Sequence, residues 1–135
     1  MRDHRTLVVR DPRFREHAPA RAHPERPERL DAVDRALDAA GEQIRNLDPR
    51  AASDEELLAV HDRSYLDALS ACIGQTRRLD PDTYCSPRSV ETARLAAGSL
   101  VEAALRVASG EATRAFAGLR PPGWSTRPAS PSRPC

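Results

Sequence analysis

The fold of this 135-residue chain is decided by the stretch 115–123, AFAGLRPPG, from Ala115 to Gly123. Its first five residues are small or apolar and uncharged, and they predict a short buried strand. The two prolines that follow Arg120 end the strand, because proline cannot donate to a sheet ladder. Ligands of open α/β sheets bind beyond the carboxyl ends of the strands, so Arg120–Gly123 is expected to border a site.

The apolar run 6–9 predicts a buried strand, and 44–47, with less apolar content, predicts a further short strand. Apolar residues at helical spacing predict helices between the strands. The predicted helices cover 27–40, 53–61, 64–73 and 87–108. Strands that alternate with helices indicate an α/β fold, and the long crossovers suit parallel pairing.

Local signals place the ends of these helices. Ser53 begins a capping-box pattern with Glu56, and Gly41 and Gly110 are predicted to cap the helices that precede them. Gly98, inside the last helix, predicts close packing against a neighbouring segment, since glycine otherwise costs a helix about 1 kcal/mol. The stretches 10–27 and 75–86 are predicted to be loops.

Composition excludes several classes of protein. The chain has 21 basic residues, all arginine, and 20 acidic residues, for a net charge of +1. This balance predicts neither nucleic-acid binding nor attraction to a membrane surface. Three widely spaced cysteines without a C-x-x-C pair favour neither a zinc ribbon nor a disulfide framework, and they indicate a reducing cytoplasm. The sequence has no apolar run of about 18 residues, the length that a helix needs to span a bilayer.

Four stretches in order resemble the histone deacetylase superfamily, which includes bacterial acetylpolyamine amidohydrolases and acetoin-utilisation proteins. The first is 23–30, HPERPERL, which resembles the family signature H-P-x-x-P-x-R, with the upstream DPRF and His17 also typical. The others are 60–66, VHDRSYL; 80–87, DPDTYCSP; and 115–123, which resembles the family's strand ending in R-P-P-G. The resemblance spans residues 7–123.

The resemblance implies the arginase/deacetylase fold, with the first strand lying between the second and the third. It also implies a catalytic Zn²⁺, held by later Asp and His residues, and two histidines directly after R-P-P-G. Here Trp124 and Ser125 follow Gly123, and no histidine lies beyond His61. The sequence therefore predicts no catalytic residue and no metal ligand in this chain, and an uncovered outer edge on the third strand.

Two roles carry over from the resemblance. Arg29 corresponds to an arginine that lines the channel through which acetate leaves, and Asp82 corresponds to a rim aspartate that binds the substrate backbone. Each has a plainer interpretation. Arg29 lies next to Glu25 and Glu28 and could form a surface ion pair with them. Asp82 could bond its own backbone in a turn.

The interpretation is a truncated deacetylase, with a deacetylase-like domain at 1–123 and a disordered tail at 124–135. The amino-acid composition of the tail resembles the translation of GC-rich coding DNA in a wrong reading frame, which suggests a frameshift just after Gly123. Intact relatives remove acetyl groups from acetyl-lysine or acetylpolyamines, and this chain is expected to be inactive alone. Two alternatives stay open: a non-catalytic interaction module, which would use the uncovered edge, and an unfolded remnant.

Overall fold

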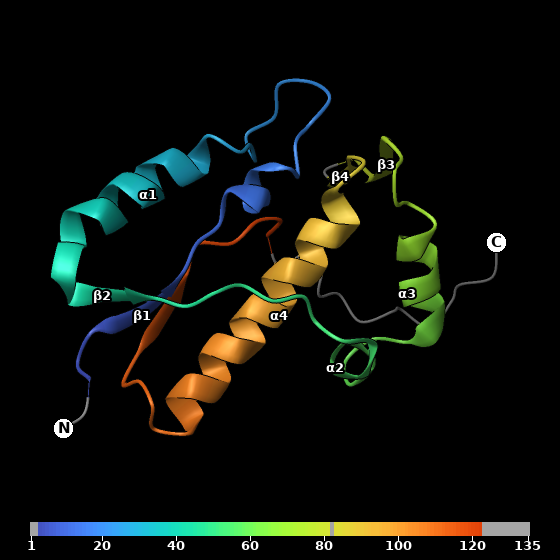
Figure 1. Cartoon of the computed structure of the whole chain (residues 1–135). Coiled ribbons are helices and arrows are strands. Elements are labelled where there is room, and N and C mark those ends of the chain that lie inside the picture. Colours follow the sequence, from blue (N-terminus) through green and yellow to red (C-terminus); the bar gives the residue numbers. More distant parts are fainter. Residues whose placement is uncertain (1–2, 82, 123–135) are drawn as a thin grey trace.

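Three parallel strands form the centre of the molecule: β1 (Thr6–Val9), β2 (Ile44–Asn46) and β5 (Ala115–Ala117). Their order is β2-β1-β5, as the resemblance implied (Figure 1). This computed structural model describes residues 3–81 and 83–122, so Asp82 and the predicted tail lie outside the described residues. Leu7, Val8 and Val9 of β1 are almost fully buried, which is typical of a central parallel strand.

Helices flank this sheet. They are α1 (Arg29–Ala40), α2 (Asp54–Leu58), α3 (Arg63–Ser70) and α4 (Ser89–Ala108), with short 3₁₀ turns η1 (Pro12–Arg15) and η2 (Gly41–Gln43). The sequence predicted that α1 and α4 begin with Pro27 and Pro87 in their first turns. In the structure each proline lies in a turn that precedes its helix, so both helices begin two residues later than predicted. None of the helices in the described ranges is long and apolar enough to cross a membrane.

Capping signals in the sequence are confirmed. Ser53 accepts a hydrogen bond from the Glu56 amide, and the Glu56 carboxylate accepts one from the Ser53 amide, which completes the capping box. Gly41 and Gly110 have φ of +50° and +78°, values that favour glycine. The helices therefore end where glycine allows the chain to turn back to the sheet.

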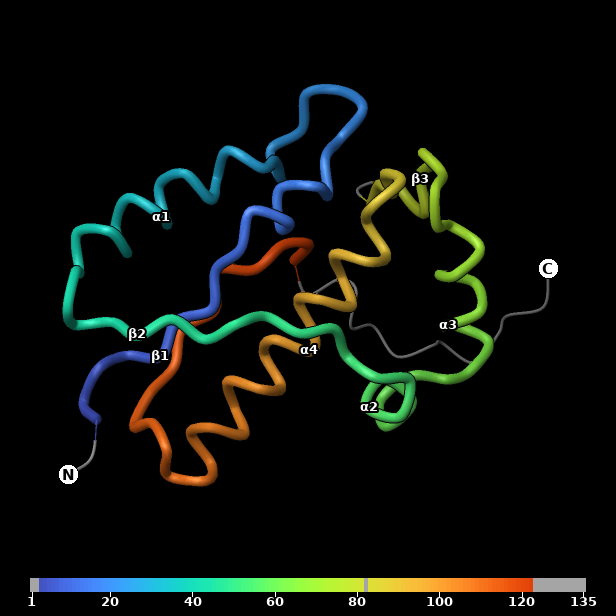
Figure 2. Tube along the Cα trace, viewed as in Figure 1, coloured from blue at the N-terminus to red at the C-terminus, as the bar shows by residue number. Residues whose placement is uncertain are grey.

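Close packing at Gly98 is also confirmed. The segment that connects β2 to α2 (residues 47–53) passes across the middle of α4 (Figure 2). A Cβ atom on Gly98 would collide with backbone atoms of Arg50, Ala51 and Ala52. The Ala52 amide also donates a 2.8 Å hydrogen bond to the carbonyl of Arg94, one turn earlier in α4. Only glycine permits this approach.

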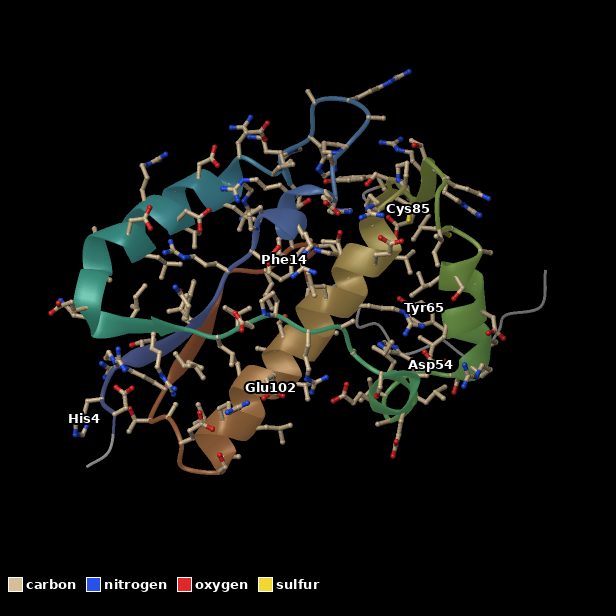
Figure 3. The ribbon with its side chains drawn as sticks, in the orientation of Figure 1. His4, Phe14, Asp54, Tyr65, Cys85 and Glu102 are labelled. Carbon is tan, nitrogen blue, oxygen red and sulfur yellow. The ribbon has the colours of Figure 1, made fainter. Side chains whose placement is uncertain are left out.

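The core lies between the sheet, α1 and α4. Phe14, on η1, is fully buried between the end of β1 and α4 (Figure 3). It packs in one cluster with residues of all three elements, namely Val9, Leu30, Leu95, Ala96 and Ala103. The η1 turn lies inside a stretch that the sequence predicted only as a loop.

A second departure from the sequence prediction is a β-hairpin. Strands β3 (Arg77–Asp80) and β4 (Thr83–Cys85) pair antiparallel where a polar loop was expected. All four residues of β3 are exposed, so no alternation of apolar and polar residues marks it in the sequence. The hairpin lies next to the loop that precedes α1 and so contributes to the site described below.

The outer edge of β5 faces no other strand in the described part of the chain. The prediction of a buried strand at 115–119 is wrong: β5 ends at Ala117, and Ala115 and Phe116 are exposed because no further strand covers this edge in the described residues. Phe116 is 45% exposed, and Leu100 on α4 is 56% exposed. Phe116 and Leu100 both line a shallow groove between α4 and β5. The uncovered edge expected from the sequence is therefore present in the described structure.

Candidate functional site

Arg120 lies three residues beyond β5 and is almost completely buried, at 3% exposure. Its Nε and Nη2 donate to the two carboxylate oxygens of Glu25, at 2.6 and 2.7 Å. Its Nη1 donates to the carbonyls of Phe14 and His17, and Nη2 also donates to the Tyr84 hydroxyl. All five N–H groups of the guanidinium are therefore used within the chain.

Glu25 and Tyr84 are coupled to this guanidinium. Burial alone would raise the pKa of Glu25, but hydrogen bonds from Arg120 and Tyr84 outweigh it and hold that pKa below its usual value. Burial, together with the Glu25 carboxylate at 2.8 Å, raises the pKa of Tyr84. At neutral pH the site thus holds an ionised pair and a protonated phenol.

His17 completes the group, which we name the Arg120 network (Arg120, Glu25, Tyr84 and His17). Its ring stacks on Tyr84 with centroids 4.4 Å apart, and its Nδ1 lies 2.6 Å from the Ser89 hydroxyl at the start of α4. Burial and the Arg120 charge lower the pKa of His17 to about 4. The ring is therefore neutral at pH 7 and serves packing rather than charge.

The network joins three parts of the molecule. The loop between η1 and α1 supplies Glu25 and His17, the hairpin supplies Tyr84, and the end of β5 supplies Arg120. Glu25 and Arg120 are 95 residues apart in the sequence, so the pair forms only when β5 is docked. The buried network fixes the loop against the carboxyl end of the sheet.

Arg29 lies beside this network, at the first residue of α1. Its side chain lines an open pocket of about 250 Å³ together with Glu25, Gly118 and Arg120. The loops after β1 and β5 therefore open on a shared pocket, as expected from the sheet topology. The predicted surface ion pair with Glu25 is not formed, because both carboxylate oxygens of Glu25 bind Arg120.

A family model of the histone deacetylase domain matches residues 23–130 of this sequence. The chain belongs to the histone deacetylase family. Its similarity to the histone deacetylase-like amidohydrolase of Pseudomonas aeruginosa is 40% identity over 81% of this chain and 30% of that protein. A probable deacetylase of Archaeoglobus fulgidus is 35% identical over 91% of this chain and 35% of its own length.

Histone deacetylase clr3 of Schizosaccharomyces pombe is 31% identical over 93% of this chain and 21% of its own length. The crystal structure of the HDA15 HD domain superposes with a TM-score of 0.80, at 33% identity. That match covers 90% of this chain and 36% of the solved one. The chain thus spans between a fifth and about a third of the length of these curated relatives.

The described residues of this deacetylase-family chain do not fit a zinc ion. Residues 3–81 and 83–122 hold no group of three His, Cys, Asp or Glu side chains that could bind a metal. His23 accepts a hydrogen bond from the Glu25 amide at 3.0 Å and so helps to order the loop that precedes α1.

His61 departs from its predicted place at the end of a helix. It lies beyond α2, is 7% exposed, and packs on the Tyr65 ring at 4.9 Å. Its Nδ1 is buried without a hydrogen-bond partner among the residues described. Both rings line a small apolar cavity of about 60 Å³ between α3 and α4.

Reasoning from the sequence missed the Arg120 network. The sequence indicates Glu25 only as a motif residue and a possible surface partner of Arg29, and Tyr84 only as part of a loop. One signal was available: Arg120 follows a strand that the sequence predicts to be buried, where a charged side chain needs a buried partner. The sequence does not say which of the 20 acidic residues that partner is.

Proposed function

We propose that this chain forms the N-terminal part of a zinc-dependent deacetylase domain. In this proposal it supplies the wall of the acetate channel through Arg29 and the substrate rim through Asp82. The observation that best supports this proposal is the pocket that Arg29 and Arg120 both line, at the carboxyl end of the sheet. Intact domains of this kind would act on acetyl-lysine or acetylpolyamine amides.

The chain by itself is expected to have no deacetylase activity. Trp124 and Ser125 stand where the family has two histidines, and the sequence has no histidine beyond His61. A metal-activated water and a general base are both needed to hydrolyse an amide at such a site. The described residues provide neither.

Turnover of an acetyl-lysine peptide and of an acetylated polyamine, with added Zn²⁺, tests this expectation. The histone deacetylase-like amidohydrolase of Pseudomonas aeruginosa serves as the positive control. We expect no turnover above the buffer rate and no stoichiometric zinc in the purified chain. Turnover that survives further purification and depends on added Zn²⁺ would contradict the proposal.

A cytoplasmic location fits the cysteines. Cys72 and Cys85 are both buried and both free thiols, and burial raises the pKa of Cys85. A buried, protonated thiol is a poor nucleophile. In a Cys135→Ser variant, labelling of the denatured but not the native protein by a thiol reagent would agree with two inert core thiols.

A second candidate function is that of a non-catalytic interaction module, favoured by the open edge of β5 and the exposed Phe116. Unpaired strand edges bind other chains by strand addition. A cooperative thermal melt with a monomeric size-exclusion profile would support a folded module. A flat circular-dichroism melt would instead identify an unfolded remnant.

A further inference from the structure

Most arginines in the described structure are neutralised by carboxylates. Arg15 contacts both Asp31 and Asp34, and Arg50 contacts both Glu56 and Glu102. Arg106 likewise contacts Glu102 and Glu111. These arginines therefore present little uncompensated charge at the surface.

Three arginines that share one hollow are exceptions. Arg21, on the loop before α1, and Arg77 and Arg78, on β3, are exposed. Within residues 3–81 and 83–122, the side chain of none of the three forms an ion pair or a hydrogen bond, although the backbones of Arg77 and Arg78 pair with β4. Three uncompensated positive charges therefore remain in one part of an otherwise balanced chain.

These side chains line a hollow of about 400 Å³ between the loop and the β3–β4 hairpin, which we name the arginine hollow. The two segments lie side by side at the top of Figure 1. Thr76 and Thr83 add hydroxyl groups to the lining. Glu25, the carboxylate nearest to the loop in sequence, is already bound to Arg120. Among the described residues of the lining, the three arginines are thus the only charged ones.

The chemistry of the hollow favours carboxylates over nucleic acid. Single-stranded nucleic acid needs aromatic faces on which bases stack. Tyr84 is the one aromatic ring of the lining other than His23, and it is already stacked on His17 with its hydroxyl bound to Glu25. The net charge of +1 also provides no extended basic surface for a phosphate backbone. A few carboxylate side chains match both the volume and the charge.

We propose that the arginine hollow binds an acidic segment of a peptide or protein partner. The guanidinium groups of Arg77, Arg78 and Arg21 donate to its Asp or Glu carboxylates, in the forked geometry that arginine and carboxylate share. The hollow borders the Arg120 network at Tyr84 but shares no lining residue with the pocket of Arg29, and it needs no metal. Binding is therefore measurable whether or not the chain takes part in deacetylation.

Fluorescence anisotropy with labelled hexaglutamate, at low ionic strength and pH 7, tests the proposal on the full chain. We expect hexaglutamate to bind at least about tenfold more tightly than hexaserine, and the affinity to fall as salt screens the charges. Arg77→Gln and Arg78→Gln should each weaken binding about fivefold, as expected for one partly exposed ion pair. Circular dichroism confirms that each variant is folded.

Arg35→Gln is the matched control, because it removes an equal charge from an exposed, unpaired position on α1 away from the hollow. It should leave the affinity within about twofold of the unchanged chain. Equal binding of hexaserine and hexaglutamate, or an equal loss in Arg35→Gln, would overturn the proposal. Tighter binding of oligothymidylate, lost in Arg77→Gln, would assign the surface to nucleic acid and also overturn it.

Discussion

The guanidinium of Arg120 makes contacts with four residues that come from three separate parts of the chain. Because every N–H group is used, this arginine holds the loop and the hairpin against the sheet and has no donor left for a substrate. The neighbouring Arg29, with no bonded partner in the described ranges, is the side chain at this end of the sheet that remains available to a ligand.

Replacement of Arg120 should be severely destabilising. Arg120→Lys keeps the charge but cannot reach both oxygens of Glu25 and the Tyr84 hydroxyl together. The hydrogen bonds that lysine cannot make leave buried acceptors unsatisfied, at a cost of about 1–3 kcal/mol each in the free energy of unfolding. Denaturant titration measures this loss, with Arg35→Lys as the exposed control. A loss below about 1 kcal/mol would show that the network contributes little.

Acid should destabilise the fold through His17. Its pKa falls from 6.5 to about 4 on folding, so between these values the unfolded chain binds a proton that the folded chain does not. Stability is therefore complete above pH 6.5 and declines as the pH falls towards 4, by about 1 kcal/mol over the first unit. Glu25, whose pKa is lowered, adds a further loss below pH 4.5.

The variant His17→Asn isolates this effect, since asparagine can keep the hydrogen bond to Ser89 without titrating. Its free energy of unfolding should vary less between pH 6.5 and 4.5 than that of the unchanged chain. Denaturation at a series of pH values measures both slopes. Parallel curves would mean that His17 does not titrate in this range.

At the scale of elements, α4 is the helix against which the sheet and the connecting segment both pack. It packs on the sheet along one side, and the connecting segment 47–53 lies against it at Gly98. The hydrogen bond from Ala52 to Arg94 fixes the segment at this point. The position of α2, which follows directly, therefore depends on one residue without a side chain.

Gly98→Ala should reverse the usual helix preference. In an exposed helix this change stabilises by about 1 kcal/mol. Here the new methyl group collides with backbone, and overpacking of this kind costs about 1–3 kcal/mol. Thermal unfolding measures the sign. Ala104→Gly, at an exposed position of α4, is the reference for helix propensity alone; a higher melting temperature for Gly98→Ala would contradict the close contact.

The whole molecule is asymmetric about its sheet. β2 and β5 are its two edge strands, and they differ in character: β2 carries Arg45 and Asn46, whereas the β5 edge has exposed apolar side chains from the strand and from α4. The balanced net charge of +1 offers little repulsion between copies. The edge is therefore the part of the described surface most prone to association.

Phe116→Glu and Leu100→Glu should each lower the tendency of concentrated chain to associate. Light scattering coupled to size exclusion measures the apparent mass as the concentration rises. Val60→Glu is the control, because Val60 is 64% exposed but lies beyond α2, away from the edge. Equal changes in all three variants would mean that association is not localised to β5.

Much of this architecture could be predicted from local patterns. Apolar runs marked β1 and β5, the spacing of the helices pointed to β2, and Ser53 and Gly98 correctly indicated a cap and a close contact. The β3–β4 hairpin could not be predicted, because exposed strands carry no periodic signal. The Arg120–Glu25 pair was missed for another reason: it depends on tertiary contacts between residues far apart in the chain, and only the fold reveals it.

The parallel sheet also has a consequence for the order of folding. β1 is the first strand to be synthesised, yet it pairs with β5, in which Ala115 lies opposite Leu7. Beside this pair, Arg114 donates to the hydroxyl of Thr6, 108 residues away in the sequence. Contacts between such distant positions form slowly, because the loop entropy is lost before the contact is gained. Pulsed hydrogen exchange should therefore find the amides of β1 and Gly118 protected late, after those inside α4.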